Sequence, residues 1–291
     1  MLGFGFSVTW DGPPAPKPRP VRVTEPGWPH GARAACAFTF DLDAETLWLA
    51  RGVTESPSRS PQGTFGVLEA LPRILDLLRQ AEIRASFFVP AWVAEHHPEA
   101  VPAIVAGGHE VGCHGDVHER VSDPRRGPGR EDSPPQPRGA HSAGVVGARS
   151  ATERRPGELS ERTLSLLARH GFEYSSNDDG SAAPLPARAA RGQATGGDSG
   201  VLVLDDAPFF MFTGQRAMQP PGPVLQAWLT EAGRHHGDRQ GDQLHVSSAD
   251  HRTTVALCLP AGAWWSTPRR TPKLWLARLD QIAAHARTAL G

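Results

Sequence analysis

Cysteine, net charge and long apolar runs are all scarce in this chain of 291 residues. Its three cysteines, Cys36, Cys113 and Cys258, are an odd number without CxxC spacing, so neither a disulfide framework nor a structural zinc knuckle is indicated. The 30 basic and 31 acidic residues leave a net charge of −1. No excess of charge therefore favours nucleic acid or an anionic membrane as a partner.

The chain also lacks the sequence features of membrane and exported proteins. No stretch approaches the roughly 20 apolar residues that a membrane-spanning helix requires. The first residues contain neither the basic segment nor the apolar segment of a secretory signal peptide. We therefore expect no membrane partner and a cytoplasmic location. Nothing in the composition indicates an oligomeric state.

Apolar residues, which make up 39% of the chain, follow an alternating pattern of strand and helix. This alternation predicts parallel strands joined by right-handed crossovers, as in an α/β barrel. Short apolar runs and helical spacing identify the elements. We expect strands over 34–41, 84–90, 109–114, 172–176 and 253–260, and helices over 64–81, 91–108, 158–171, 222–236 and 271–290.

The expected organisation is one domain over 31–291, preceded by a proline-rich extended lead-in over 1–30. Residues 122–157 contain hardly any large apolar residues, and residues 178–200 are mostly Ala, Gly, Pro, Arg and Ser. Neither tract can bury enough apolar surface to order itself. We therefore expect these two tracts to be irregular. Such long structureless insertions are unusual inside a compact domain, which makes the two tracts anomalous.

Acidic and imidazole side chains come at the ends of two predicted strands. Asp41 and Asp43 end the first strand, and His114 and His118 follow the third. Carboxylates at i and i+2 of an extended segment point the same way. Imidazoles at i and i+4 of one helical turn can reach one ion at about 2.1 Å. The pattern predicts a metal site with a spare acid, which suits metal-assisted hydrolysis.

A purely structural reading of these residues stays open. An acid at a strand end often only caps a turn, and 13 histidines can produce an HxxxH spacing by chance. An α/β domain without a metal site is therefore one alternative. We expect His109, at the start of a strand, to be structural. The histidines expected to lie on helix surfaces or ends, in contact with solvent, are His96, His97, His170, His235 and His236.

The motifs resemble the polysaccharide deacetylase family, also called the NodB-homology or carbohydrate esterase 4 group. FTFDLDAE (38–45) is similar to a spaced form of the family motif TFDDG, and HGDVH (114–118) is similar to its HxxxH motif. The flanking residues resemble the subgroup of cytoplasmic, peptidoglycan-deacetylase-like and allantoinase-like members. The similarity is found over 34–121, 158–177 and 201–212.

The resemblance implies a fold, a reaction and a set of site residues. The fold would be a distorted, incomplete parallel (β/α) barrel. Asp43, His114 and His118 would bind a divalent metal, most often zinc, and Asp41 would be the general base. The implied reaction is hydrolysis of a carbon–nitrogen bond other than a peptide bond. It would be the N-deacetylation of an N-acylated sugar in carbohydrate metabolism, or hydrolysis of a small ureide-type amide.

The chain departs from the family before the segment GELSERTLSLL (157–167). There the family has an arginine that holds the base carboxylate, and Arg149 is our candidate, with Arg155 as the second choice. The departure favours an alternative in which the chain is a catalytically impaired, metal-binding homologue with a binding or regulatory role. A displaced reading frame over 122–157 is a further hypothesis, which resequencing of the coding region would test.

The last residues that the family places at the site are a late histidine and an acidic pair. The late histidine acts as general acid, and His245 is our candidate for it, with His251 as the second choice. Asp205 and Asp206 match the subgroup, and we expect them to orient catalytic groups.

Overall fold

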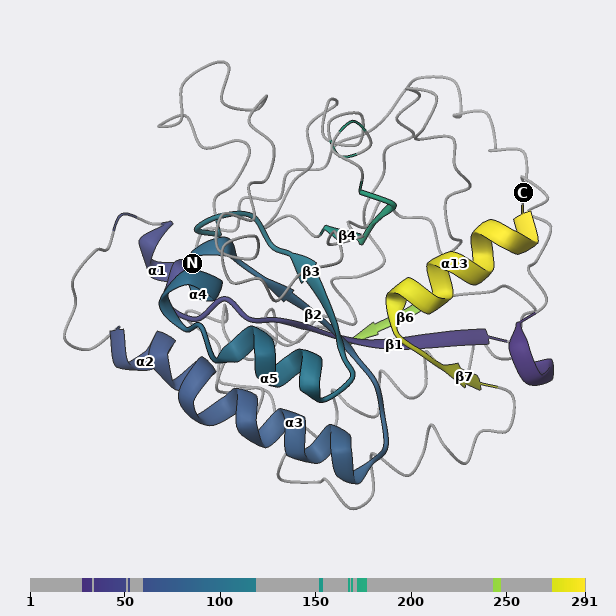
Figure 1. Cartoon of the computed structure of the whole chain (residues 1–291), viewed down its shortest axis with the longest axis horizontal. Coiled ribbons are helices and arrows are strands. Elements are labelled where there is room, and N and C mark those ends of the chain that lie inside the picture. The colour runs from purple at the N-terminus through teal and green to yellow at the C-terminus, as the bar shows by residue number, and fades with distance from the viewer. Residues whose placement is uncertain are drawn as a thin grey trace, which may run out of the picture.

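The computed structural model describes residues 28–32, 34–50, 52, 60–118, 152–153, 167, 169, 172–176, 243–246 and 274–290 (Figure 1). Several predicted segments lie outside these residues. They are most of the proline-rich lead-in and of the helix over 158–171, the tract 178–200, the helix over 222–236 and the strand over 253–260.

Three parallel strands form the centre of the structure, as the sequence pattern predicts. They are β1 (Ala34–Asp41), β2 (Ser86–Val89) and β3 (Glu110–Cys113). In the register of the sheet, Asp41 pairs with Phe88, and Val89 pairs with Cys113. The carboxyl ends of the three strands are therefore level, and the residues that follow them meet at one edge.

Four further strands extend this sheet on both sides. They are β4 (Thr152–Glu153), β5 (Tyr174–Ser175), β6 (Gln243–Val246) and β7 (Leu274–Leu276). The order is β5-β4-β3-β2-β1-β6, and β7 also pairs with β1. Every pairing is parallel. Within the described residues β5 and β6 do not pair, so the described sheet is not closed. β4 lies inside the tract 122–157, which therefore supplies a strand that the sequence analysis did not predict.

The predicted helix over 64–81 is present with an irregular start. It consists of α2 (Ser60–Phe65), a π-helical turn η2 (Gly66–Ala70) and α3 (Leu71–Gln80). The predicted helix over 91–108 is two helices, α4 (Ala91–His96) and α5 (Ala100–Ala106). His97 leaves the helical conformation, with φ −126° and ψ 65°, because the following Pro98 disfavours it in the residue before.

The closing helix is shorter than the sequence pattern predicts. The pattern predicts a helix over 271–290, whereas Leu274–Leu276 is strand β7 and the helix α13 is Leu279–Leu290. The remaining elements are the short helix α1 (Thr46–Leu49) and the 3-10 turn η1 (Pro29–Gly31). No helix in the described part of the chain is both long and apolar enough to cross a membrane.

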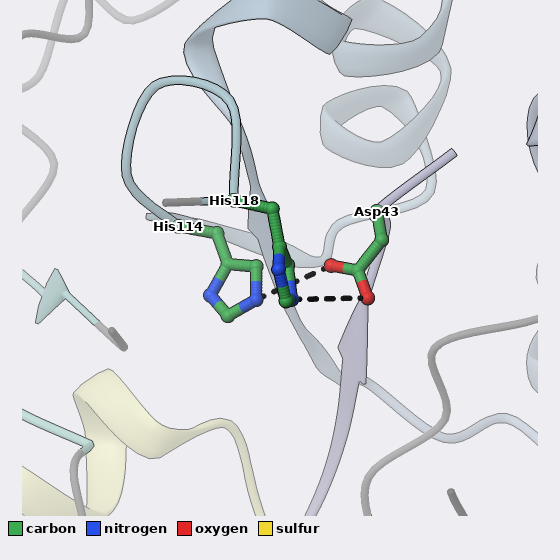
Figure 2. A group of neighbouring side chains, drawn as sticks. All are labelled: Asp43, His114 and His118. Carbon is green, nitrogen blue, oxygen red and sulfur yellow. Dashed lines mark ion pairs between the residues drawn. The ribbon is translucent and has the colours of Figure 1, made fainter. Parts of the chain in front are cut away.

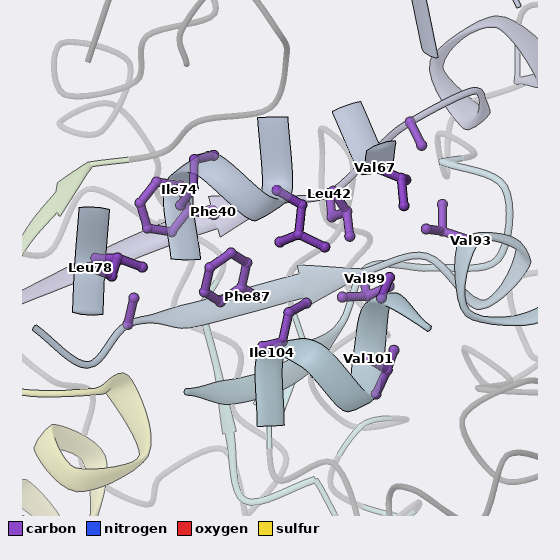
Figure 3. Close-up of a cluster of buried hydrophobic side chains, with 14 of the residues drawn as sticks. Phe40, Leu42, Val67, Ile74, Leu78, Phe87, Val89, Val93, Val101 and Ile104 are labelled. Carbon is purple, nitrogen blue, oxygen red and sulfur yellow. The ribbon is translucent and has the colours of Figure 1, made fainter. Parts of the chain in front are cut away.

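One face of the sheet packs against α3 and α5 (Figures 1 and 3). Alternate residues of β1 point to this side, and Phe40 stacks on Phe87 of β2 with ring centroids 4.9 Å apart. Burial of a large apolar side chain contributes about 1.5–3 kcal/mol, so this cluster fixes the helices on the sheet. Its other buried members include Phe38, Leu42, Ile74, Leu78 and Ile104.

The intervening residues of β1 face the other side of the sheet. Ala35 and Ala37 are small and fully buried there, against Leu279 and Ile282 of α13. Because side chains alternate along a strand, Asp41 continues this series. The acidic end of β1 therefore faces away from the layer of α3 and α5.

A buried polar network joins α13 to the strands near their amino ends. Glu110 accepts hydrogen bonds from the hydroxyl groups of Ser86, at 2.5 Å, and Tyr174. The backbone N–H of Asp280 donates to the same carboxylate at 3.2 Å, and that of Leu279 donates to Ser86 Oγ at 3.0 Å. Burial raises the pKa of Glu110.

Candidate metal centre

A tight turn after β1 presents Asp43 to the centre of the site. Leu42 N–H donates to Phe88 O at 2.8 Å, which extends the pairing with β2 beyond Asp41. The backbone then turns at Ala44, whose φ is +48°. Both the N–H and the hydroxyl of Thr46 donate to Asp43 O, at 3.0 and 2.5 Å. Asp43 is held as a result with only 2% of its side chain exposed.

The two histidines of the HxxxH motif come from the loop after β3. His114 N–H donates to Val89 O at 3.2 Å, so His114 is still aligned with the neighbouring strand. The prediction of a helical turn between the histidines is wrong. Residues 115–117 form a turn, with φ +74° at Gly115 and +58° at His118. The reversal of the chain, rather than a helix face, brings the second imidazole back toward the first.

The side chains of Asp43, His114 and His118 converge on one point (Figure 2). Asp43 Oδ1 lies 3.2 Å from His114 Nε2, and Asp43 Oδ2 lies 3.5 Å from His118 Nε2. One ligand atom from each residue falls within 4.8 Å of the others. Ligand atoms around a tetrahedral zinc ion are about 3.3 Å apart. One carboxylate and two imidazoles therefore fit a divalent metal of the zinc type.

The electrostatics of the three side chains also suit a cation. Burial, and to a lesser extent His114, lowers the pKa of His118, while Asp43 and Asp41 act in the opposite direction. A neutral imidazole is the form that binds metal. Asp43 Oδ1 and His114 Nε2 are both shielded from solvent. A buried carboxylate is stabilised by a positive charge beside it.

Asp41 lies next to this group without belonging to it. Its Oδ2 is 3.8 Å from His114 Nε2, and 14% of its side chain is exposed. A carboxylate at the rim of the site can accept a proton from a water molecule there. The structure thus places the four residues of the two predicted motifs together, with three in the ligand group and one beside it.

The other predicted site residues are not placed with these four. Arg149 lies outside the described residues, as do Arg155, His251, Asp205 and Asp206. The backbone of His245 is in β6 and pairs with Ala37, four residues before Asp41. That separation is about 13 Å along a strand. The side chain of His245 lies outside the description, so its assignment as general acid stays a prediction.

His109 has the structural role that its position predicts. It is 5% exposed, and its Nδ1 accepts a hydrogen bond from Ala85 N–H at 3.1 Å. Its ring packs against that of Phe87 in a T-shaped arrangement, with centroids 5.3 Å apart. Burial, with smaller contributions from Arg84 and Arg278, lowers its pKa to about 4. His109 is therefore a neutral core residue near neutral pH.

The prediction of solvent exposure is wrong for His97. Its side chain is only 13% exposed, and its Nε2 lies 3.0 Å from Glu45 Oε2. By contrast, His96 is exposed as predicted and stacks on Trp92 with centroids 3.8 Å apart. Sequence reasoning also missed Glu45, whose position two residues after Asp43 was the available signal.

Comparison with known proteins supports the resemblance that the motifs carry. The family model described as polysaccharide deacetylase matches residues 63–138. The crystal structure of a candidate polysaccharide deacetylase from Mycobacterium smegmatis is 26% identical in sequence. It superposes with a TM-score of 0.76 over 90% of this chain and 92% of that chain. This chain is thus similar to the polysaccharide deacetylases in sequence over residues 63–138 and in fold over most of its length. The predicted resemblance and the parallel (β/α) fold are confirmed.

Two curated relatives are similar to part of this chain. The peptidoglycan deacetylase of Helicobacter pylori is 37% identical over 84 residues, which are 28% of this chain and 29% of that protein. The peptidoglycan deacetylase-like protein FGM2 of Gibberella zeae is 27% identical over 164 residues, 53% of this chain and 46% of that protein. This chain thus spans less than half the length of either relative.

Proposed function

We propose that this protein is a metal-dependent hydrolase that removes the acyl group from an N-acylated sugar or polysaccharide. The observation that carries the proposal is the convergence of Asp43, His114 and His118, with Asp41 3.8 Å from His114. The match of residues 63–138 to the polysaccharide deacetylase family model supports amide hydrolysis as the reaction. The name of the Helicobacter pylori relative favours an N-acetylated amino-sugar polymer as the substrate class.

Asp43, His114 and His118 would hold the metal, and zinc is the ion that this set of ligands favours. Bound there, a divalent cation would polarise the acyl carbonyl and lower the pKa of a water molecule to about 7. The neutral state of His118, which burial favours by lowering its pKa, keeps its lone pair available to the cation.

Asp41 would act as the general base in this reaction. Its carboxylate borders the ligand group and is 14% exposed, so it can meet both a water molecule and a substrate. Asp41 accepts a proton as the water oxygen adds to the carbonyl carbon. The carbon–nitrogen bond then breaks, and the nitrogen leaves with a proton, which gives a carboxylic acid and a free amine.

Metal analysis combined with an acetate-release assay tests this proposal. The purified full chain should retain about one equivalent of metal per chain after dialysis, as a site with three protein ligands predicts. It should release acetate from N-acetylglucosamine oligomers or peptidoglycan, and a chelator should abolish the release until zinc is restored. Bound metal without turnover would favour the impaired homologue, and turnover of a ureide alone would favour the small-amide alternative. Absence of metal would contradict the proposal.

A further inference from the structure

Glu45 and His97 form a carboxylate–imidazole pair beside the candidate metal centre. His97 Nε2 lies 3.2 Å from Glu45 Oε1 and 3.0 Å from Oε2. Both side chains are largely buried, with 14% and 13% exposed. Thr64 Oγ1 also donates to Glu45 Oε1 at 2.8 Å. The Glu45 carboxylate therefore joins segments that are far apart along the chain.

Glu45 is part of the turn that carries Asp43. Trp48 N–H and Leu49 N–H both donate to Glu45 O, at 2.9 and 3.1 Å. Gly63 packs directly on the Glu45 backbone, because a Cβ at Gly63 would lie 2.7 Å from Glu45 Cα and N. Any movement of Glu45 would consequently move the turn from which Asp43 reaches the site.

His97 is connected to the other ligand loop through α4. Its N–H donates to Val93 O at 2.8 Å and closes the end of that helix. At the opposite end, Ala91 N–H donates to Gly115 O and Trp92 N–H donates to Asp116 O, each at 3.0 Å. Both acceptors lie between His114 and His118. Figure 1 shows α1 and α4 at the same end of the sheet.

We infer that α4 and the Glu45–His97 pair form a brace between the two loops that carry the metal ligands. One end of the brace holds the Asp43 turn, and the other holds the loop of His114 and His118. Glu45 and His97 are then positioning residues, which set the distance between the carboxylate ligand and the two imidazoles. The inference rests on the proposed metal site and deepens it.

A metal site whose ligands come from separate loops depends on such outer contacts. Loss of a residue that orients ligands typically weakens metal affinity by about 10–100-fold. We expect a loss of this size from Glu45→Ala and from His97→Ala. The double variant should bind no more weakly than the weaker single variant, because both changes break the same connection.

The control is a second ion pair remote from the site. Arg278 and Asp280 are 2.7 Å apart with side chains 29% and 31% exposed, at the α13 side of the molecule (Figure 1). Asp280→Ala should lower the unfolding temperature and leave metal affinity unchanged. Comparison with this variant separates positioning of the ligands from general loss of stability.

The experiment measures Zn²⁺ affinity by chelator competition in the full chain, together with the absorption spectrum of the Co²⁺-loaded protein. Weaker Zn²⁺ binding and an altered Co²⁺ spectrum in Glu45→Ala and His97→Ala, with partial recovery in Glu45→Gln, would support the brace. His97→Gln carries the test if an alanine variant does not fold.

Two results would overturn the inference. One is wild-type affinity in the Glu45 and His97 variants, which would leave the proposed function intact. The other is an equal loss of affinity in Asp280→Ala. If the unaltered protein itself bound no Zn²⁺, the proposed function would fail first and the brace with it.

Discussion

His114 Nε2 lies 3.2 Å from Asp43 Oδ1, in a contact between two strand ends that are far apart in the sequence. The distance is close to the separation of about 3.3 Å expected for two ligands of one tetrahedral zinc ion. His118 Nε2 meets the other oxygen of the same carboxylate at 3.5 Å. One buried carboxylate thus faces both imidazoles, so we expect bound metal to depend on all three side chains.

Replacement of either histidine by alanine should remove most of the bound metal. His114→Ala and His118→Ala leave two protein ligands in place of three, which is too few to retain a labile ion. Asp43→Asn should have a milder effect, because an amide oxygen still coordinates weakly. Metal content after dialysis measures the change, with the exposed His96→Ala as control. Full metal occupancy in either histidine variant would show that the ligand assignment is wrong.

Asp41→Asn should retain metal and lose turnover. The variant keeps the size of the side chain and removes the base, whose contribution is typically about 10²–10⁴-fold. Acetate release and metal content should be measured on the same preparation. Loss of the metal in this variant would instead identify Asp41 as a ligand, and the two acids would exchange roles.

His109 should make the folded protein less stable in mild acid. Its pKa falls from an ordinary value of 6.5 to about 4 on burial, so the unfolded chain binds the proton more readily. The contribution of the neutral ring to stability is fully present above pH 6.5 and is lost as the pH falls toward 4. His109→Asn keeps an acceptor for Ala85 N–H and should flatten this part of a urea-unfolding profile. The exposed His30→Asn is the control, and an equal effect of both variants would contradict the prediction.

Glu110 should give a pH dependence of the opposite sign. Burial raises its pKa above the ordinary value of 4.5, so the folded state holds the proton more tightly than the unfolded chain. Its contribution to stability is present below that ordinary value and is lost as the pH rises through the folded pKa. Glu110→Gln should remove this loss in the same unfolding experiment. Glu69→Gln, at a carboxylate that is 53% exposed, is the matched control, and an equal effect of both variants would contradict the prediction.

Local patterns were sufficient to predict the central strands and the convergence of the two motifs. The apolar run that ends in Asp41 is β1 to the residue, and parallel pairing brings its end level with that of β3. Strands β4, β6 and β7 could not be predicted in this way. Leu274–Leu276 forms a strand only because the edge of β1 is available to it, and a short segment carries no local sign of a distant partner.

The environment of His97 shows why its exposure was predicted wrongly. Helical spacing over 91–108 places it on a solvent face, but the chain leaves the helix there before Pro98. The changed direction turns the imidazole toward Glu45. The chain therefore leaves the helix at the same residue, His97, that contacts Glu45 beside the candidate metal centre. The cytoplasmic location stays a prediction.

The pairing of β1 with β7 joins Ala34 to Leu274 and so has a consequence for how the chain folds. During synthesis, β1 leaves the ribosome long before the strand that completes this part of its edge. Until then its backbone N–H and C=O groups are open to pairing with other chains. Contacts between such distant segments also slow folding. Recovery of the native protein should therefore depend on dilution or on chaperones that shield this edge while translation continues.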